Sequence, residues 1–254
     1  MLITERYADL TTGARLHYEE AGEGAPLIAV HGFMGTARKD LGTVIDWLSA
    51  DYRVLGPTLR GYGRSTPRPR QFPFDFYRRD AADVLAFMDA LEIEQAHLLG
   101  YSDGGEVALI AAGTQPDRFL SVAVWGAIGY FGPAVRAAVQ TMYPARWVTE
   151  EDMDMHGIED ADRFVLAWVQ AMKHMVDSGG DISLSLADRI TAPLLMMIGE
   201  SDKLCPEADG RRFIDRTPNG QLEMFACGHA IHEQLPERFR QTVGGFLRSV
   251  SIGH

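Results

Sequence analysis

The chain of 254 residues contains little cysteine, no long apolar run and fewer basic than acidic residues. Its two cysteines, Cys205 and Cys227, are too few for a disulfide framework and suit a reducing compartment, so we expect a cytoplasmic protein. No apolar run approaches the ~20 residues that a membrane-spanning helix needs. The net charge of −11 argues against nucleic acid or an anionic membrane as a partner. Charged residues interrupt the first ten residues, so we expect no signal peptide there.

Short apolar runs are what the chain does have, and they recur along its length. Six of them predict strands that are buried on both faces of a parallel sheet. They are APLIAVHG, YRVLGPT, QAHLLGY, LSVAVWGA, APLLMMIGE and QLEMFAC. Segments with helical periodicity lie between them, for example Arg79 to Leu91, and residues 3–21 have the alternation of a β-hairpin. This order predicts an α/β fold with one doubly wound, mostly parallel sheet.

The rhythm of strands stops between residues 129 and 186, where helical segments rich in Met and Trp occur instead. Ligands of open α/β sheets bind beyond the carboxyl ends of the strands. We therefore expect residues 129–186 to form a helical lid at that edge. The core of this single structural domain then comprises residues 1–128 and 187–254. The alternative is that the inserted helices only cover apolar surface.

A serine stands between glycines in the pentapeptide G-Y-S-D-G, residues 100–104. The pentapeptide follows a predicted strand and precedes a predicted helix, which is the context of a nucleophile elbow. In such an elbow the turn is tight, the serine is strained and its hydroxyl is exposed. We therefore identify Ser102 as the candidate nucleophile, the alternative being an ordinary glycine-rich turn.

A serine nucleophile needs a base, and the base needs an orienting carboxylate. In elbows of this type the chain order is serine, then acid, then histidine. Asp202 follows one apolar run and His229 follows the next, so we assign Asp202 as the orienting acid and His229 as the general base. Glu200 is the alternative acid, and His232 is the alternative base.

Stabilisation of a tetrahedral intermediate requires two hydrogen-bond donors directed at its oxyanion. We expect these donors to be the backbone N–H groups of Asp103 and of Phe33, which lies in the loop HGFMG. His31 in the same loop is more simply a structural residue that braces it. Five residues close to these loops are expected to contact substrate: Gly32, Met34, Tyr101, Asp103 and Trp125.

A metal centre is the main chemical alternative. Its ligands would come from Asp202, Cys205, Cys227, His229 and His232, but these lack the C-x-x-C or H-x-x-x-H spacing of a zinc site. The turn LRGYGRS is glycine-rich, but it lacks the lysine of a phosphate-binding loop. We therefore expect neither metal nor cofactor. Because Cys205 and Cys227 follow adjacent predicted strands, a regulatory disulfide between them is a further hypothesis.

The motifs HGFMG, LRGYGRS, GYSDGG, GESD and GHAIHEQLPERF, in this order, resemble the landmarks of the α/β-hydrolase superfamily. The resemblance covers nearly the whole chain and implies the α/β-hydrolase fold and a cofactor-independent serine hydrolase. The stretch from GYSDGG to VWGAIGY is similar to the valacyclovir-hydrolase (biphenyl-hydrolase-like) family. That likeness implies cleavage of α-amino-acid esters, with Asp103 binding the amino group of the substrate.

An aspartate beside the nucleophile has a second explanation, because an acid at a helix start complements the helix dipole by about 0.3–1 kcal/mol. We nevertheless expect a small-molecule ester substrate with a free α-amino group, cleaved through an acyl-enzyme. The alternatives are a general carboxylesterase or lactonase, a C–C bond hydrolase, a proline-releasing aminopeptidase, and a non-catalytic ligand-binding member of the fold. The sequence does not indicate the oligomeric state.

Overall fold

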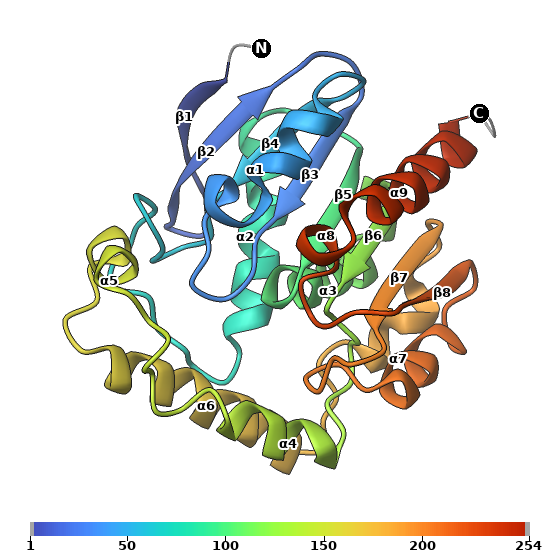
Figure 1. Cartoon of the computed structure of the whole chain (residues 1–254). Helices are drawn as coiled ribbons and strands as arrows, with labels where there is room; N and C mark the ends of the chain where they lie inside the picture. Colours follow the sequence, from blue (N-terminus) through green and yellow to red (C-terminus); the bar gives the residue numbers. More distant parts are fainter. Residues whose placement is uncertain (1–2, 252–254) are drawn as a thin grey trace.

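A computed structural model describes residues 3–251. Residues 1–2 and 252–254, which the sequence analysis assigns to the core, lie outside the described residues. One eight-stranded sheet crosses the molecule in the order β1-β2-β4-β3-β5-β6-β7-β8 (Figure 1). Its strands are β1 Thr4–Asp9, β2 Arg15–Ala21, β3 Pro26–Val30, β4 Arg53–Pro57, β5 Ala96–Tyr101, β6 Phe119–Trp125, β7 Leu194–Gly199 and β8 Gly220–Phe225.

The strand pattern confirms the predicted hairpin and the positions of all six predicted strands. Five of the six are buried as expected, whereas β8 lies at the edge of the sheet and is only partly buried. Strands β1 and β2 pair antiparallel, as do β2 and β4, whereas β4 through β8 pair parallel in the sheet order. From β3 the chain passes to β4 on one side and then to β5 on the other. Such a reversal opens a crevice at the carboxyl ends of the strands, where ligands bind in open α/β sheets.

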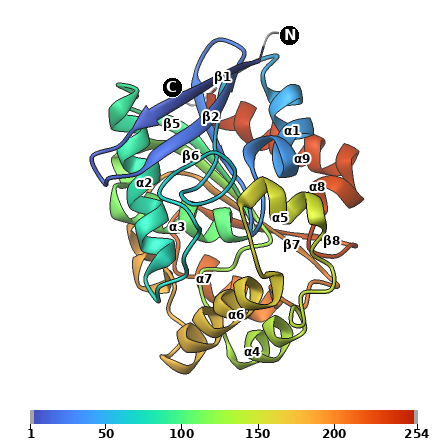
Figure 2. The ribbon, with the colours of Figure 1, turned by 90° about the vertical axis from the view of Figure 1, so that its left-hand side faces the viewer.

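Helices cover both faces of the sheet, which is why its central strands are apolar throughout (Figures 1 and 2). One face packs against α1, α8 and α9. The other packs against α2, α3 and α7. The bounds are α1 Ala37–Leu48, α2 Phe76–Ala90, α3 Asp103–Thr114, α7 Glu207–Ile214, α8 Ile231–Gln234 and α9 Pro236–Ser251.

Three helices connect β6 to β7, namely α4 (Pro133–Gln140), α5 (Glu150–His156) and α6 (Ala161–Asp177). They lie beyond the carboxyl ends of the strands, with α4 and α6 at the bottom of Figure 1 and α5 at its left. The first of them, α4, ends at Gln140, ahead of the helix-breaking Pro144. Two short 3₁₀ helices, η1 (Pro116–Arg118) and η2 (Leu184–Arg189), flank β6 and β7.

Both cysteines are free thiols, Cys205 buried and Cys227 half-buried, so the hypothesised disulfide between them is not formed in this structure. Within residues 3–251 we find no helix that is both long enough and apolar enough to cross a bilayer.

Candidate active site

Ser102 lies on a sharp turn between β5 and α3. Its backbone has φ 55° and ψ −123°, a conformation that costs a residue with a side chain about 1–3 kcal/mol. Gly104 is required two residues later, because a Cβ there would lie 2.3 Å from the carbonyl oxygen of Val30. The tight packing of this turn against β3 holds the hydroxyl of Ser102 at the carboxyl edge of the sheet.

The loops after β5, β7 and β8 bring Ser102, Asp202 and His229 together. The Oγ of Ser102 lies 2.8 Å from Nε2 of His229, and Nδ1 of His229 lies 2.6 Å from Oδ2 of Asp202. Burial raises the pKa of Asp202, but the hydrogen bond to His229 and the charge of the ring outweigh it and leave this pKa below its ordinary value. A hydroxyl, an imidazole and a carboxylate in this order can activate the hydroxyl for attack.

The alternative acid and base are placed elsewhere. Glu200 is exposed on the surface. His232 is buried and uses both ring nitrogens: Nδ1 accepts the indole N–H of Trp125 at 3.0 Å, and Nε2 donates to the carbonyl of Asp40 at 3.0 Å. With no free lone pair on its ring, His232 has a structural role here.

The loop after β3 runs directly alongside Ser102. A Cβ on Gly32 would lie 3.0 Å from the Cβ of Ser102, so a side chain there would crowd the hydroxyl. The backbone N–H of Gly32 donates to Oδ2 of Asp40 at 3.0 Å. His31 is fully buried, and burial lowers its pKa to about 3. It is therefore neutral, and its Nε2 accepts the N–H of Leu59 at 2.9 Å.

Two backbone N–H groups near Ser102 are available to a ligand. Across residues 3–251, neither the N–H of Phe33 nor that of Asp103 donates a hydrogen bond to the protein. These are the two donors that the sequence analysis expects for an oxyanion.

His156 connects the inserted helix α5 to this loop. Its Nδ1 accepts the N–H of Gly63 at 3.0 Å, and its Nε2 donates to the carbonyl oxygen of Met34 at 3.0 Å. Burial lowers the pKa of His156 to about 4, so the ring is neutral and can both accept and donate. Because Met34 directly follows Phe33 and has a positive φ of 56°, this bond holds the chain in a conformation that it would otherwise avoid.

Asp103 is buried beneath α2 and α6. Its Oδ1 accepts the hydroxyl of Tyr77 at 2.6 Å, and its Oδ2 accepts the indole N–H of Trp168 at 3.0 Å. Burial raises the pKa of the carboxyl group from its ordinary 3.8 to about 6, although both hydrogen bonds act in the opposite direction. The carboxylate therefore has two neutral donors around it.

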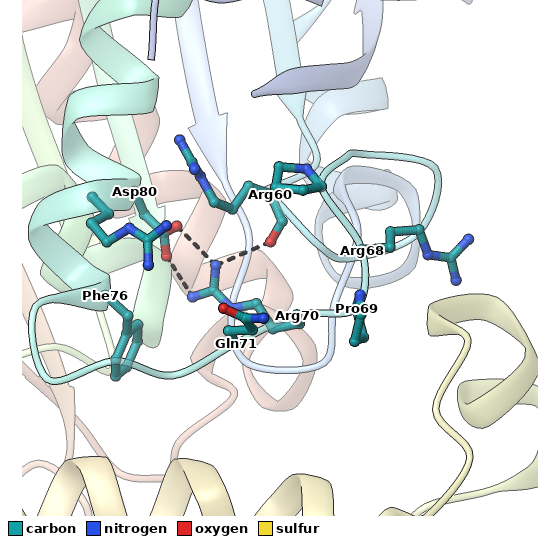
Figure 3. Close-up of a pocket in the computed structure, with 9 residues that line it drawn as sticks. Arg60, Arg68, Pro69, Arg70, Gln71, Phe76 and Asp80 are labelled. Atoms are coloured by element: carbon teal, nitrogen blue, oxygen red, sulfur yellow. Dashed lines mark hydrogen bonds and ion pairs between the residues drawn. The ribbon is translucent and has the colours of Figure 1, made fainter. Parts of the chain in front are cut away.

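The nearest buried cation does not neutralise Asp103. The guanidinium of Arg70 binds the two carboxylate oxygens of Asp80 at 2.8 and 2.6 Å, and it also donates to the carbonyl of Arg60 (Figure 3). Its positive charge lowers the pKa of Asp103, whereas the negative charge of Asp80 raises it. Among the described residues no cation forms an ion pair with Asp103.

A cavity of about 20 Å³ adjoins Ser102, enough for about one water molecule. It is lined by Tyr77, Ser102, Asp103, Glu106, Gly126, Phe131, Val135, Trp168, Met172, Leu204, Cys205 and His229. Glu106 is a second buried carboxylate, and burial raises its pKa to about 7. The carboxylate of Glu106 has a hydrogen-bond partner, because its Oε1 accepts the N–H of Ile128 at 2.8 Å.

Of the five residues expected to contact substrate, only Asp103 lines this cavity. Trp125 requires a correction: it is fully buried on the opposite face of the sheet, with its ring 4.8 Å from that of Phe239 in α9. The alternation of side chains along β6 is the reason. Tyr101 stacks on Trp125, and Met34 is buried in the core.

An aromatic layer lies between this cavity and a larger groove. The ring of Phe33 stacks on Trp168 at 4.5 Å and also lies 6.0 Å from Phe164 and 5.8 Å from Phe72. Phe72 and Phe164 form part of the wall of a groove of about 660 Å³ between residues 68–72 and the inserted helices. The layer thus has the cavity on one side and the groove on the other.

Residues absent from the sequence-based assignment include four whose side chains form hydrogen bonds at this site: Tyr77, Glu106, His156 and Trp168. Trp168 lies on the apolar face of a helix whose periodicity is evident, so a contact with the sheet edge was foreseeable. Tyr77 and His156 carry no local signal, because their partners are distant in sequence.

Comparison with known proteins gives one family. Residues 25–180 match the family described as alpha/beta hydrolase fold. The chain is 30% identical over 246 residues to the serine hydrolase BPHL of Homo sapiens, covering 93% of this chain and 84% of that protein. It is 28% identical to the 2-hydroxymuconate semialdehyde hydrolase of Pseudomonas sp. (strain CF600), covering 94% of this chain and 92% of that protein. The solved structure of a 2-hydroxy-6-oxo-6-phenylhexa-2,4-dienoate hydrolase from Rhodococcus sp. strain RHA1 shares the fold, with a TM-score of 0.79 at 19% identity over 97% of this chain and 100% of that chain.

The contacts of His156 predict a loss of stability on substitution. His156→Phe keeps an aromatic ring but leaves the N–H of Gly63 without a partner, at about 1–3 kcal/mol, and leaves the carbonyl of Met34 with only the longer 3.4 Å bond from Lys39. The exposed His174→Phe is the matched control and should change the free energy of unfolding by less than about 0.5 kcal/mol. Urea unfolding measures both, and equal midpoints for the two variants would contradict this prediction.

The raised pKa of Asp103 predicts a dependence of stability on pH. The folded protein binds the proton of this carboxyl group more tightly than the unfolded chain does. The protonated group therefore stabilises the fold below about pH 4, and this stabilisation is lost as pH rises through about 6. The unfolding free energy of wild type, relative to Asp103→Asn, should fall by about 2–3 kcal/mol between pH 4 and 7. Urea unfolding at four pH values gives this difference, and a difference that stays constant with pH would contradict the assignment.

Proposed function

The chain is a serine hydrolase of the α/β-hydrolase family, and from that premise we propose that it hydrolyses esters of α-amino acids with Ser102 as nucleophile. The contact that carries this proposal is the 2.8 Å approach of Nε2 of His229 to the hydroxyl of Ser102. The similarity to BPHL, a serine hydrolase by name, supports the reaction type.

In the first half of the proposed reaction, Oγ of Ser102 attacks the ester carbonyl while Nε2 of His229 takes the hydroxyl proton. Asp202 stabilises the imidazolium that results. The N–H groups of Phe33 and Asp103 stabilise the oxyanion. Collapse of the tetrahedral intermediate breaks the C–O bond to the alcohol, which leaves with the proton from His229. The product of this half is an acyl-enzyme on Ser102.

In the second half, water attacks the acyl carbonyl and gives its proton to Nε2 of His229. Collapse of this intermediate returns that proton to Oγ of Ser102 and releases the carboxylic acid. No group outside the protein, the ester and water takes part in the proposed cycle.

Asp103 supports the choice of an amino-acid ester. A carboxylate beside a developing oxyanion raises the barrier by charge repulsion unless a cation offsets it. The buried side chain has two neutral hydrogen-bond donors and no paired cation among residues 3–251. The ammonium of an α-amino ester lies one carbon from the reacting carbonyl, so it reaches the residue next to Ser102. An uncharged substrate leaves this carboxylate unmatched, which gives discrimination.

A C–C bond hydrolase or a lactonase is the second candidate function. It rests on the similarity to the Pseudomonas 2-hydroxymuconate semialdehyde hydrolase and to the 3-oxoadipate enol-lactonase 1 of Acinetobacter baylyi, which is 26% identical. The same serine, histidine and aspartate serve those reactions in principle. The absence of a paired cation for Asp103 within the described residues favours the amino-acid ester.

Residues 129–186 act in this proposal as a lid over a core of residues 1–128 and 187–254. The cavity beside Ser102 has room for about one water molecule, which is far too little for an amino-acid ester. Substrate access therefore requires movement, and the stacked pair of Phe33 and Trp168 is the contact that must separate.

The proposed nucleophile predicts complete loss of covalent labelling on substitution. Wild type should react with a fluorophosphonate probe, and Ser102→Ala should neither label nor hydrolyse ester, with kcat reduced about 10³-fold or more. Ser201→Ala, an exposed serine next to Asp202, is the matched control and should label like wild type. Intact-protein mass spectrometry reports the adduct. Labelling of Ser102→Ala would refute the assignment, and failure of wild type to label would favour a non-catalytic protein.

The proposed ammonium site predicts a preference for free amines. A phenylalanine ester should exceed its N-acetyl and des-amino counterparts in kcat/KM by about tenfold to a thousandfold, and Asp103→Asn should erase that preference. Asp154→Asn, which removes an exposed carboxylate from α5, should retain it. Equal rates for the three esters on wild type would make Asp103 a helix-start residue and the protein a general esterase.

A further inference from the structure

A second group of ligands surrounds the proposed base. Asp202, Cys205 and His229 each offer one ligand atom, and these three atoms lie within 4.8 Å of one another. Carboxylate oxygen, thiolate sulfur and imidazole nitrogen are the ligands that zinc prefers in proteins. Of the five metal-capable residues considered in the sequence, the structure thus groups three, and Cys227 and His232 are not members of this group.

We propose that Asp202, Cys205 and His229 bind a borderline-soft divalent cation such as Zn²⁺, and that the bound ion switches the hydrolase off. The binding itself depends only on these three side chains. The inhibition rests on the function proposed above, because it requires His229 to act as the base.

The geometry needs little adjustment. Ligand atoms of a tetrahedral zinc site, with bonds of about 2.0–2.3 Å, lie roughly 3.3–3.8 Å apart, so the group must contract by about 1.5 Å at most. Asp202 and Cys205 stand three residues apart on the single loop between β7 and α7, so their side chains belong to one short segment. The N–H of Leu204 donates to Oδ1 of Asp202 at 2.9 Å and so fixes that side chain.

The surroundings also suit the ion. Cys205 and His229 line the cavity beside Ser102, which holds about one water molecule and so can supply the fourth ligand. Coordination releases the thiol proton to solvent, and no oxidation or reduction takes place. The charge of Zn²⁺ then cancels against one thiolate and one carboxylate, so a buried site of no net charge results.

Inhibition follows whichever nitrogen of His229 takes the ion. If Nε2 coordinates, the lone pair that accepts the proton of Ser102 is occupied. If Nδ1 coordinates, the remaining ring proton resides on Nε2, which can then no longer accept. Asp202 is withdrawn from the ring in both cases. The imidazole therefore cannot serve as base while the ion is bound.

Binding is tested without catalysis, in the Ser102→Ala background. Cd²⁺ titration should produce the ultraviolet charge-transfer absorption of a cadmium thiolate, and Zn²⁺ should displace it in competition. Cys205→Val and Cys205→Ser should abolish the absorption, and the matched control Cys227→Ser should retain it. Three results would refute the proposed metal site. They are an absorption that survives both Cys205 substitutions, an absorption that is lost in Cys227→Ser, and no absorption in the Ser102→Ala protein.

Inhibition is tested in proteins that carry Ser102, each compared with its own rate in the absence of metal. Zn²⁺ should inhibit ester hydrolysis by wild type and Cys227→Ser alike, and EDTA should restore it. Since changes to outer-shell partners already weaken metal sites by about 10–100-fold, both Cys205 variants should require at least about 100-fold more Zn²⁺. Equal inhibition of all variants would overturn the proposal. If the protein binds cadmium but cleaves no ester, the proposed function is wrong and the proposed metal site is still supported.

Discussion

The buried carboxylate of Asp103 is the charge around which the site is arranged. It is the residue after Ser102, yet its two hydrogen-bond donors come from elsewhere, Tyr77 on α2 and Trp168 on α6. One ionisable group thus joins the turn that carries Ser102, the sheet-covering helix α2 and the inserted helix α6. Its raised pKa reports an unfavourable desolvation that hydrogen bonds to neutral groups only partly offset. In the proposed reaction, the ammonium group of the substrate supplies the cation that this carboxylate lacks among residues 3–251.

Four histidines in and around the site differ in burial. His31, His156 and His232 are buried, each with a lowered pKa, and each uses its ring nitrogens to join backbone segments or an indole. His229 is only partly buried and has one nitrogen directed at Ser102. Neutral imidazoles that both donate and accept make good braces for loops without regular structure. Histidine therefore has two uses here: buried histidines hold the loops around Ser102, and the partly buried His229 is the proposed base.

The strands, the elbow and the order of serine, acid and histidine were predictable, because each depends on a few neighbouring residues. The apolar runs need only burial on both faces, and Gly104 needs only the close approach of β3. The apolar face that carries Trp168 was predictable, but its hydrogen bond to Asp103 was not, since the two residues lie 65 positions apart along the chain. The wrong prediction for Trp125 has a different cause. Successive side chains of β6 point to opposite faces of the sheet, and the pattern VAVW is apolar on both faces, so the sequence does not show which face Trp125 occupies.

If substrate enters as proposed, by separation of the stacked rings of Phe33 and Trp168, the measured substrate affinity depends on the fraction of molecules that are open. If the closed arrangement predominates, the apparent dissociation constant is the intrinsic one divided by the fraction of molecules that are open. Substitutions in α6 or in residues 68–72 then change KM through that fraction, with Ser102, Asp202 and His229 untouched. Natural variation in the inserted helices can therefore retune this hydrolase to scarce or abundant substrates without any change in its chemistry.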